Sequence, residues 1–272
     1  MIPLIDSLAH PTVSGKWFNQ GLEASFSSLI EDMKKANFIA ACAVGLAGIE
    51  NYSHELFIKE CNKYKSLIPI AGVNPKSAIK IDEEISYIKK LGYKGIKIHP
   101  RYSLIDFEDD NLVKVFKSAA VHNLVVFFCT YNHSKVENYV EYDPFYSLIK
   151  ILKKAQDTRV VLVHGGNIEL LRYAELVRFN PNLLLDLSLT IIKYKGSSID
   201  MDIKFLFDNF DQRISIGSDY PEYSHSALRE RFDFFSQDLT KEKKENIAYK
   251  NLIDFLTLNE IEMATKLFQK SK

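Results

Sequence analysis

The sequence predicts an α/β protein: a single (β/α)8 barrel of the TIM-barrel type, with an extra helix at its C-terminal end. Strand-like apolar segments alternate with helix-like amphipathic segments along nearly all of the 272 residues. This alternation is typical of parallel strands joined by right-handed crossovers. About eight such pairs match the size of a closed barrel. No Gly-rich nucleotide-binding motif follows a strand, which argues against an open doubly wound sheet.

The expected strands are short apolar runs bounded by polar or turn-forming residues. They cover residues 2–6, 38–44, 67–73, 95–99, 124–130, 159–164, 183–188 and 213–219. The expected helices cover residues 21–35, 54–63, 79–91, 111–122, 144–155, 168–179, 201–210 and 226–237, and the extra helix covers 241–256. No linker or change of composition divides the chain, so we expect one domain over residues 1–272.

Composition restricts the partners and the location. The chain has 35 Lys and Arg residues against 35 Asp and Glu residues and no basic stripe, so nucleic acid and anionic membranes are poor candidate partners. The three cysteines show no paired spacing, which fits a reducing compartment. The N-terminus has no signal-peptide pattern, and no segment has the roughly 18 apolar residues of a membrane span. We therefore expect a cytoplasmic protein that acts on a small molecule. Whether it forms a homodimer stays open.

Alternation along the strands indicates which polar side chains enter the barrel. In the fourth strand, Lys97 and His99 lie opposite the isoleucines, and in the seventh strand Asp186 and Ser188 lie opposite the leucines. The aliphatic faces suit the helix layer, so we expect the polar side chains inside. A buried charge is costly unless it is paired, and we predict that Lys97 and Asp186 come close together. The alternative is an open sheet with Lys97 on an exposed edge.

The eighth strand ends in a carboxylate. Ile214 and Ile216 share one face of this strand, and Asp219 follows on the other face. With helices covering the isoleucine face, Asp219 would stand at the C-terminal mouth of the barrel, facing inward. The alternative is that Asp219 belongs to a turn and caps the next helix.

Further polar residues occur at or just after strand ends, namely His10, His99, Cys129 and His164. The C-terminal ends of the strands meet at one face of a barrel, where the active site lies. We therefore expect these residues and Asp219 to gather around one cavity. The longer connections, 9–20, 100–110 and 131–142, follow the first, fourth and fifth strands and lie at the same face.

Two smaller expectations concern the first strand and the remaining histidines. Residues Asp6, Leu8 and His10 are in phase if the first strand is regular. Three histidines fall in or beside expected helices and are interpreted as surface or packing residues, and a fourth lies in a loop and could be of either kind. The three are His54, His122 and His225, and the fourth is His133.

In combination and order, several of these segments resemble the amidohydrolase superfamily, specifically its amidohydrolase-related branch of decarboxylases and lactonases that act on carboxylated substrates. The similar segments are Ile5-Asp-Ser-Leu-Ala-His10, Gly95-Ile-Lys-Ile-His-Pro100, Val163-His-Gly-Gly166, Leu185-Asp-Leu-Ser188, Gly217-Ser-Asp-Tyr-Pro221 and Asn246-Ile-Ala-Tyr-Lys-Asn251. The resemblance covers almost the entire chain. It implies a TIM-barrel hydrolase of the metal-dependent type.

Two positions depart from the family pattern. The resemblance implies one divalent metal held by Asp-x-His-x-His on the first strand, a His on the fifth and the Asp of the eighth, with the His of the sixth near the bound water. Here Leu8 stands at the first His position and Cys129 at the fifth-strand His position. Leu cannot bind a metal, whereas a Cys thiolate suits zinc. The resemblance therefore implies a degenerate site that is either metal-free or holds zinc through His10, Cys129 and Asp219, with His164 as a fourth candidate.

The expected activity is hydrolysis of a small carbonyl compound, such as a lactone, ester or amide, that carries a carboxylate. Asp219 would act as general base on water, while His10, His99 and His164 polarise the carbonyl or stabilise an oxyanion. The candidates for holding the substrate are Lys97, Arg101, Tyr131, Asp186 and Ser188. Two alternatives stay open: a decarboxylase of the same branch, and a barrel without catalysis that binds a ligand or a partner.

Overall fold

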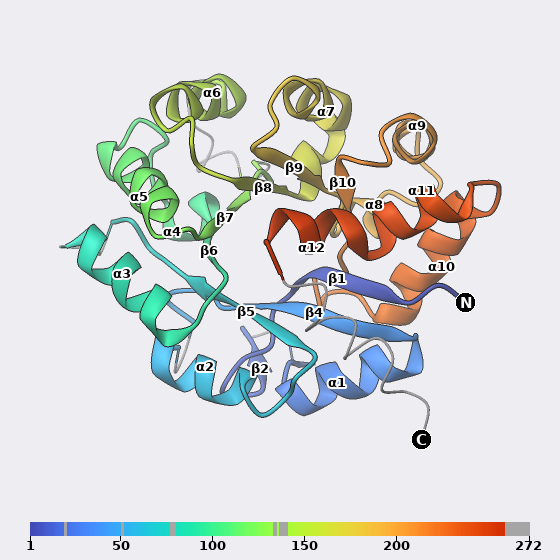
Figure 1. Cartoon of the computed structure of the whole chain (residues 1–272), viewed down its shortest axis with the longest axis horizontal. Helices are drawn as coiled ribbons and strands as arrows, with labels where there is room; N and C mark the ends of the chain where they lie inside the picture. Colours follow the sequence, from blue (N-terminus) through green and yellow to red (C-terminus); the bar gives the residue numbers. More distant parts are fainter. Residues whose placement is uncertain (19–20, 50–51, 77–79, 133–134, 136–140, 259–272) are drawn as a thin grey trace.

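The chain is described by a computed structural model that covers residues 1–18, 21–49, 52–76, 80–132, 135 and 141–258. Its main sheet has eight strands in the order β1-β4-β5-β6-β7-β8-β9-β10, and each neighbouring pair is parallel (Figure 1). These strands are β1 (Leu4–Ala9), β4 (Phe38–Val44), β5 (Leu67–Gly72), β6 (Gly95–Ile98), β7 (Val125–Cys129), β8 (Val160–Val163), β9 (Leu183–Asp186) and β10 (Ile214–Ser215).

The sheet closes between its first and last strands. Ala9 forms a parallel bridge with Tyr220, and the Ser7 amide donates to the Ile216 carbonyl at 2.9 Å. The predicted closed barrel is therefore confirmed. The expected eighth strand over residues 213–219 is shorter, because only two of its residues have regular strand pairing.

A ring of helices surrounds the barrel (Figure 1). It consists of α1 (Phe26–Lys35), α2 (His54–Cys61), α3 (Ile81–Leu91), α5 (Asp110–Val121), α6 (Pro144–Lys154), α7 (Leu170–Arg178), α9 (Ile199–Asn209) and α10 (His225–Ser236). The additional elements are the hairpin β2 (Lys16–Trp17) and β3 (Leu22–Glu23), the short helices α4 (Pro100–Ser103) and α8 (Thr190–Lys193), and the 3-10 helix η2 (His164–Glu169). The predicted helix over 21–35 is wrong in its first turn, because Leu22 and Glu23 pair with β2 and Ser25 caps α1. None of the described helices is long and apolar enough to cross a membrane.

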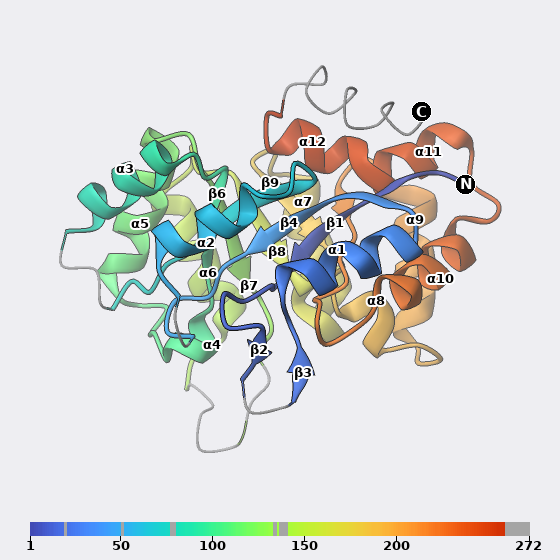
Figure 2. The ribbon, with the colours of Figure 1, turned by 90° about the horizontal axis from the view of Figure 1, so that it is seen from below.

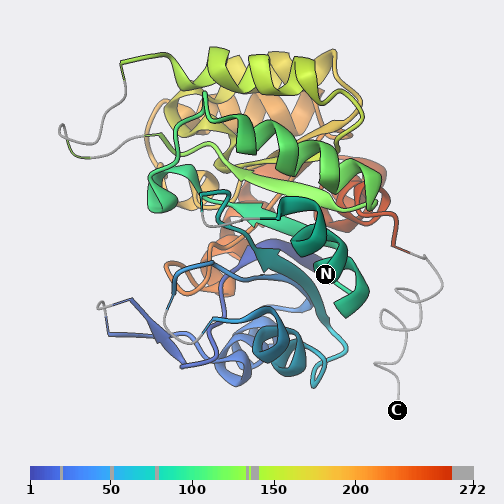
Figure 3. The ribbon, with the colours of Figure 1, turned by 90° about the vertical axis from the view of Figure 1, so that its left-hand side faces the viewer.

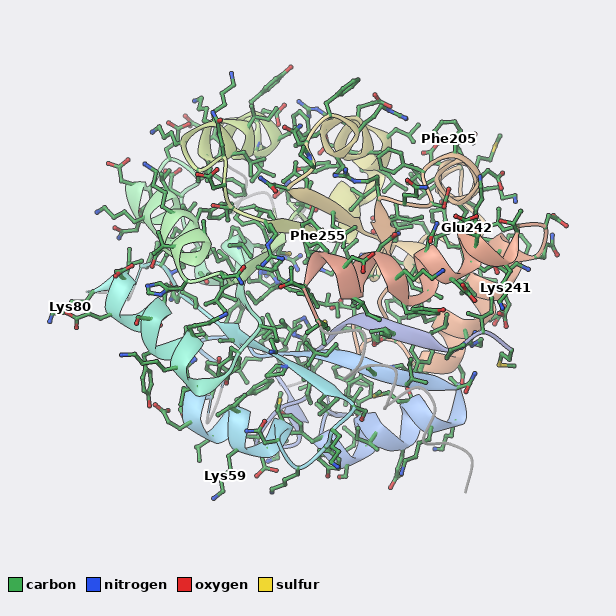
Figure 4. The ribbon with its side chains drawn as sticks, viewed as in Figure 1. Lys59, Lys80, Phe205, Lys241, Glu242 and Phe255 are labelled. Carbon is green, nitrogen blue, oxygen red and sulfur yellow. The ribbon has the colours of Figure 1, made fainter. Side chains whose placement is uncertain are left out.

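The expected extra helix over 241–256 is a continuous helical segment made of α11 (Lys241–Glu245), the π-helical η3 (Asn246–Lys250) and α12 (Asn251–Phe255). Figure 2 shows α11 and α12 at one end of the barrel and the β2–β3 hairpin at the opposite end, and Figure 3 shows the same separation from the side. In Figure 4, Phe255 lies near the centre of the end that α12 covers, while Lys59 and Lys80 extend from its edge. The loops after the strands therefore open at the hairpin end.

Two apolar clusters confirm the faces that alternation predicts. The outer cluster includes Ile96, Ile98, Leu185 and Ile214, which pack with the helices. The inner cluster contains side chains from most of the strands together with three from the last helical segment, namely Leu252, Ile253 and Leu256. The last segment thus covers the N-terminal end of the barrel interior with apolar side chains.

The first strand contains an irregularity that alternation does not predict. Its register with β4 shifts between Asp6 and Ala9. Ser7 consequently donates a hydrogen bond to Asp186 inside the barrel, whereas Asp6 meets His225 of α10, with Oδ2 2.9 Å from the His225 Nε2. Asp6 was expected to share one face of the strand with Leu8 and His10. This expectation is wrong, because a bulge inserts one residue into the strand after Asp6.

Candidate active site

A cavity of about 500 Å³ opens at the C-terminal ends of the strands. Its wall includes His10, His99, His164 and Asp219, which come from the ends of β1, β6 and β8 and from the segment after β10. Four of the five residues expected to gather there line one cavity. The fifth, Cys129, is buried at the end of β7, with Sγ 3.8 Å from the His99 Nε2.

The carboxylate of Asp219 pairs with His10. The His10 Nε2 lies 3.4 Å from Asp219 Oδ1, and the His10 Nδ1 lies 2.8 Å from the Val44 carbonyl. Because a carbonyl only accepts, Nδ1 carries a proton and Nε2 is directed at the carboxylate. The alternative that Asp219 caps the next helix is wrong, since the Ser224 side chain accepts from the Ala227 amide at the start of α10.

Asp219 is held in its ionised form. Burial alone would raise the pKa of Asp219. His164, His10 and Lys97 act in the opposite direction and hold that pKa well below its usual value. A buried carboxylate that stays charged beside imidazoles can accept a proton from a water molecule.

The backbone around Asp219 is constrained from behind. Asp219 has φ 58° and His164 has φ 70°, both in the left-handed region. Asp6 fixes the residue before the carboxylate, because its Oδ1 accepts from the Ser218 amide at 2.9 Å and its Oδ2 from the Ser218 hydroxyl at 2.5 Å. Two non-glycine residues in strained conformations persist only where the surroundings hold them, which is common at functional sites.

His164 is oriented by Ser188, which follows strand β9. Its Nδ1 lies 3.0 Å from the Ser188 carbonyl and 3.2 Å from the Ser188 Oγ. Ser188 in turn donates to Asp186, which also accepts from Ser7 and Ser215. Asp186 and Ser188 are fully buried and do not line the cavity. The structure therefore places them behind His164, rather than on the wall where a substrate would bind.

The predicted Lys97–Asp186 pair does not form an ion pair. Asp186 takes serine hydroxyls instead, and burial raises its pKa to about 6. Lys97 is 1% exposed, as expected for an inward position, and its Nζ has no hydrogen-bond partner among the described residues. Burial lowers the pKa of Lys97, while Cys129 and Asp219 oppose this effect. A one-residue shift in β1 supplies Ser7 to Asp186, which alternation could not predict.

His99 lines the cavity, and Cys129 is buried next to it, outside the lining. Burial, Lys97 and Arg101 lower the pKa of His99 to about 3, so this ring is neutral at pH 7. Its Nδ1 accepts from the Tyr102 amide at 3.2 Å. The neutral ring therefore carries its proton on Nε2, facing the Cys129 sulfur. Burial alone would raise the pKa of the thiol, but His164 and Lys97 lower it to about 7.

The rim of the cavity is cationic on one side. Arg101, Tyr131, Lys135 and Lys193 line it. Lys193 donates from Nζ to the Tyr131 hydroxyl at 2.8 Å, and the Arg101 guanidinium lies 4.4 Å from the centre of the Tyr131 ring. Sequence reasoning identified Arg101 and Tyr131 but missed both lysines. Lys193 lies in α8, which follows β9. Its position after the C-terminal end of a strand could have identified it as a cavity residue.

The other side of the cavity is aromatic. Trp17 of the hairpin stacks on His10 with ring centres 5.4 Å apart, and its Nε1 donates to Glu222 at 2.6 Å. Phe18 and Tyr102 continue this wall. Sequence reasoning missed Trp17, because the hairpin that presents it was expected to be a loop followed by a helix.

The donor set does not fit the metal that the resemblance implies. Within the described ranges, no group of three or more His, Cys, Asp or Glu side chains is arranged to hold a metal ion. Leu8, at the position of the first ligand, packs in the apolar interior of the barrel. Cys129 is directed at His99. We therefore derive no chemical step through a metal.

The remaining histidines have structural surroundings. His54 contacts the Tyr52 hydroxyl at 3.0 Å, and His122 lies 3.3 Å from the exposed Asp82. His225 is fully buried and lies between the carboxylates of Asp6 and Asp32, so it is not a surface residue. His133 lies outside the described residues.

A closed (β/α)8 barrel with an acidic and histidine-lined cavity at the C-terminal ends of its strands has the arrangement that barrel enzymes share. More specifically, the amidohydrolase family model matches residues 37–258, and the chain belongs to this family. The family resemblance read from the sequence is thereby confirmed. A search of curated proteins by sequence finds no match.

Solved structures of the same fold include three informative ones. An uncharacterised TIM-barrel protein from Bordetella bronchiseptica is 16% identical, with a TM-score of 0.73 over 94% of this chain and 99% of that chain. A probable 2-pyrone-4,6-dicarboxylic acid hydrolase from Acinetobacter baumannii, with citric acid bound, is 17% identical, with a TM-score of 0.67 over 94% and 100%. The 5-carboxyvanillate decarboxylase from Sphingomonas paucimobilis is 11% identical, with a TM-score of 0.67 over 94% and 99%. At these identities the likeness shows the fold alone.

Proposed function

We propose that the protein is a hydrolase that opens the carbonyl–oxygen bond of a small carboxylated lactone or ester. The observation that carries the proposal is the buried, ionised Asp219 on the wall of the cavity, beside His10 and His164. Asp219 takes a proton from water as the water oxygen bonds to the carbonyl carbon. The carbon–oxygen bond of the lactone or ester then breaks, and the leaving alkoxide takes that proton from Asp219, which returns to its ionised form. His164 holds its Nδ1 on the Ser188 carbonyl, so in the protonated form it presents Nε2–H to the carbonyl oxygen, while the His10 Nε2 orients the Asp219 carboxylate.

The cationic rim supports a substrate with a carboxylate. Arg101, Lys135 and Lys193 line a cavity whose volume suits a small molecule. A guanidinium can bind a carboxylate with two parallel hydrogen bonds. The family relatives with the same fold include a probable hydrolase of a pyrone dicarboxylic acid, solved with citric acid bound, and these names agree with an acidic substrate.

The proposal extends to the cellular location and the partners of the protein. The three cysteines are unpaired, which supports a cytoplasmic location. We also propose a free small molecule as the partner, without nucleic acid or membrane. A homodimer is compatible with this function and is measured by sedimentation.

The test is a panel of lactones, esters and amides, each with and without a carboxylate, at pH 7. Asp219→Asn keeps the size of the side chain and removes the base, so kcat should fall by roughly 10² to 10⁴-fold. The matched control is Asp157→Asn, an exposed position, with unchanged kcat. Hydrolysis that persists at full rate in Asp219→Asn contradicts the assignment of the base. Release of CO2 instead of an alcohol would identify the decarboxylase alternative, and absence of any turnover would favour a binding protein.

A further inference from the structure

The cavity wall contains a closed chain of contacts that includes the carboxylate of Asp219. The His10 Nε2 lies 3.4 Å from Asp219 Oδ1, and the His10 ring stacks on Trp17, with ring centres 5.4 Å apart and planes inclined by 17°. The Trp17 Nε1 donates to Glu222 Oε1 at 2.6 Å. The chain is completed by the Glu222 amide, which donates to the Asp219 carbonyl at 3.0 Å. All four residues line the cavity.

Trp17 supplies a restraint on His10 that hydrogen bonds supply only weakly. The two ring nitrogens of His10 face the Val44 carbonyl and the Asp219 carboxylate. These contacts lie near the plane of the ring, so they resist tilting of that plane only weakly. The distance and the angle of the Trp17–His10 pair are those of an attractive offset stack. The stack therefore fixes the tilt of the imidazole, and with it the direction of Nε2 toward Asp219.

The indole of Trp17 is itself held in place. It is 5% exposed and packs with Ala24 and Leu46. The β2–β3 hairpin that carries it is tied to the segment of the carboxylate, because the Tyr220 hydroxyl donates to the Glu23 carbonyl at 3.0 Å. A side chain that is locked by packing and by hydrogen bonds can hold its neighbour in one orientation.

We propose that Trp17 is a positioning residue: through His10, it holds the Asp219 carboxylate in the direction from which it takes a proton from water. This inference rests on the proposed hydrolase function. In this role Trp17 needs no contact with the reacting atoms. Its effect is on the alignment of the base, and a misplacement of about 1 Å can lower a rate by about 100-fold.

The test compares Trp17→Ala with Trp17→Phe on a panel compound that the wild-type protein hydrolyses. Trp17→Ala removes the stack, so kcat should fall by about 100-fold, while KM stays nearly unchanged. Trp17→Phe keeps an aromatic ring against His10 and should recover at least about 10-fold of that loss. The matched control is Leu22→Ala, which removes an exposed side chain opposite Trp17 in the hairpin and should change neither kcat nor KM.

A double-mutant cycle tests the connection through Glu222. Glu222→Ala removes the acceptor of the indole N–H and should lower kcat by about 10-fold, as expected for coupled neighbours. Because Glu222 acts through Trp17, the double variant Trp17→Ala/Glu222→Ala should be no slower than Trp17→Ala alone. Losses that multiply would show that the two side chains act independently and would overturn the proposal. If Trp17→Ala does not fold, an unchanged kcat in Glu222→Ala overturns it as well.

The modification of His10 by diethyl pyrocarbonate, followed by peptide mapping, provides a measurement that needs no activity. His10 is 4% exposed, and Trp17 covers one face of its ring. A covered group reacts only through local opening, so the rate at His10 should rise at least about 10-fold in Trp17→Ala and much less in Trp17→Phe. The rate at His122, whose side chain is 22% exposed, is the reference within each sample.

The outcomes separate the two proposals. A wild-type kcat in Trp17→Ala, or a raised KM with an unchanged kcat, overturns the positioning role and leaves the hydrolase function in place. If the wild-type protein turns over no panel compound, the hydrolase function fails, and the modification rate decides on the contact. A faster rate at His10 in Trp17→Ala then supports the restraint of this ring by Trp17, and an unchanged rate overturns it.

Discussion

The buried His225 should make the stability of the barrel depend on pH. Its Nε2 lies 2.9 Å from Asp6 Oδ2, and its Nδ1 lies 2.9 Å from Asp32 Oδ2. Burial alone would lower the pKa of His225. The hydrogen bonds to Asp32 and Asp6 outweigh this effect and raise the pKa to about 9. The perturbation is His225→Gln, which removes the charge and keeps a polar side chain.

The sign and size of the effect follow from linkage. The unfolded chain binds this proton with a pKa of 6.5, so the folded state binds it more tightly. The stabilisation is fully present below pH 6.5 and is lost as the pH rises through about 9. The rise of the pKa from 6.5 to about 9 corresponds to roughly 3 kcal/mol, at 1.36 kcal/mol for each unit of pKa. For a chain of this length, that is on the order of 5–10 °C in Tm.

The assay is thermal unfolding followed by circular dichroism at pH 6, 8 and 9.5. The difference in Tm between the wild-type protein and His225→Gln should be largest at pH 6 and should shrink toward zero at pH 9.5. The matched control is His122→Gln. His122 pairs with the exposed Asp82, and such a pair contributes about 0–1 kcal/mol. A Tm difference for His225→Gln that stays constant from pH 6 to 9.5 would refute the assignment of a charged, buried imidazolium.

Three further predictions concern the site and the backbone behind it. Leu8→His combined with Cys129→His should bind zinc in a metal analysis of the purified protein, whereas either single variant should not; a folded double variant without zinc would show that the positions are not equivalent to the family ligands. Lys193→Met should raise KM for carboxylated substrates by about 10 to 100-fold and leave KM for uncharged ones unchanged, while Lys195→Met, at an exposed ion pair, should alter neither; equal losses on both substrate types would contradict a carboxylate contact. Gly166→Ala should destabilise the fold by about 2 kcal/mol or more, because φ is 76° and the added Cβ would lie 2.1 Å from a tyrosine ring carbon; an unchanged Tm would mean that the turn after β8 can relax.

Period-two alternation predicted the interior of the barrel well where the strands are regular. Lys97 in β6 and Asp186 in β9 are both buried on the inner face, and Ile214 packs on the outer face. In such strands each residue's face follows from its position alone. In β1 the extra residue between Asp6 and Ala9 changes the face of everything after it, and no local pattern in the sequence marks the bulge.

Pairing within the interior was harder to predict than placement. Lys97 and Asp186 were both expected inside and close together. The Asp186 carboxylate instead accepts hydrogen bonds from three serine hydroxyls. The wall residues Trp17 and Lys193 come from a hairpin and a short helix between the regular elements. Their positions depend on the folding of connections, for which strand and helix periodicity gives no information.

The way the ring closes has a consequence for how the chain is made. The bridge of Ala9 with Tyr220 joins the two ends of the strand order, and Leu252 and Ile253 cover the open interior. A growing polypeptide cannot form either contact until most of its length has left the ribosome. During synthesis, the early strands therefore form an unfinished sheet with unpaired edges, which are sites of aggregation. Premature release before α12 should accordingly yield insoluble chains, and not a barrel that lacks only one helix.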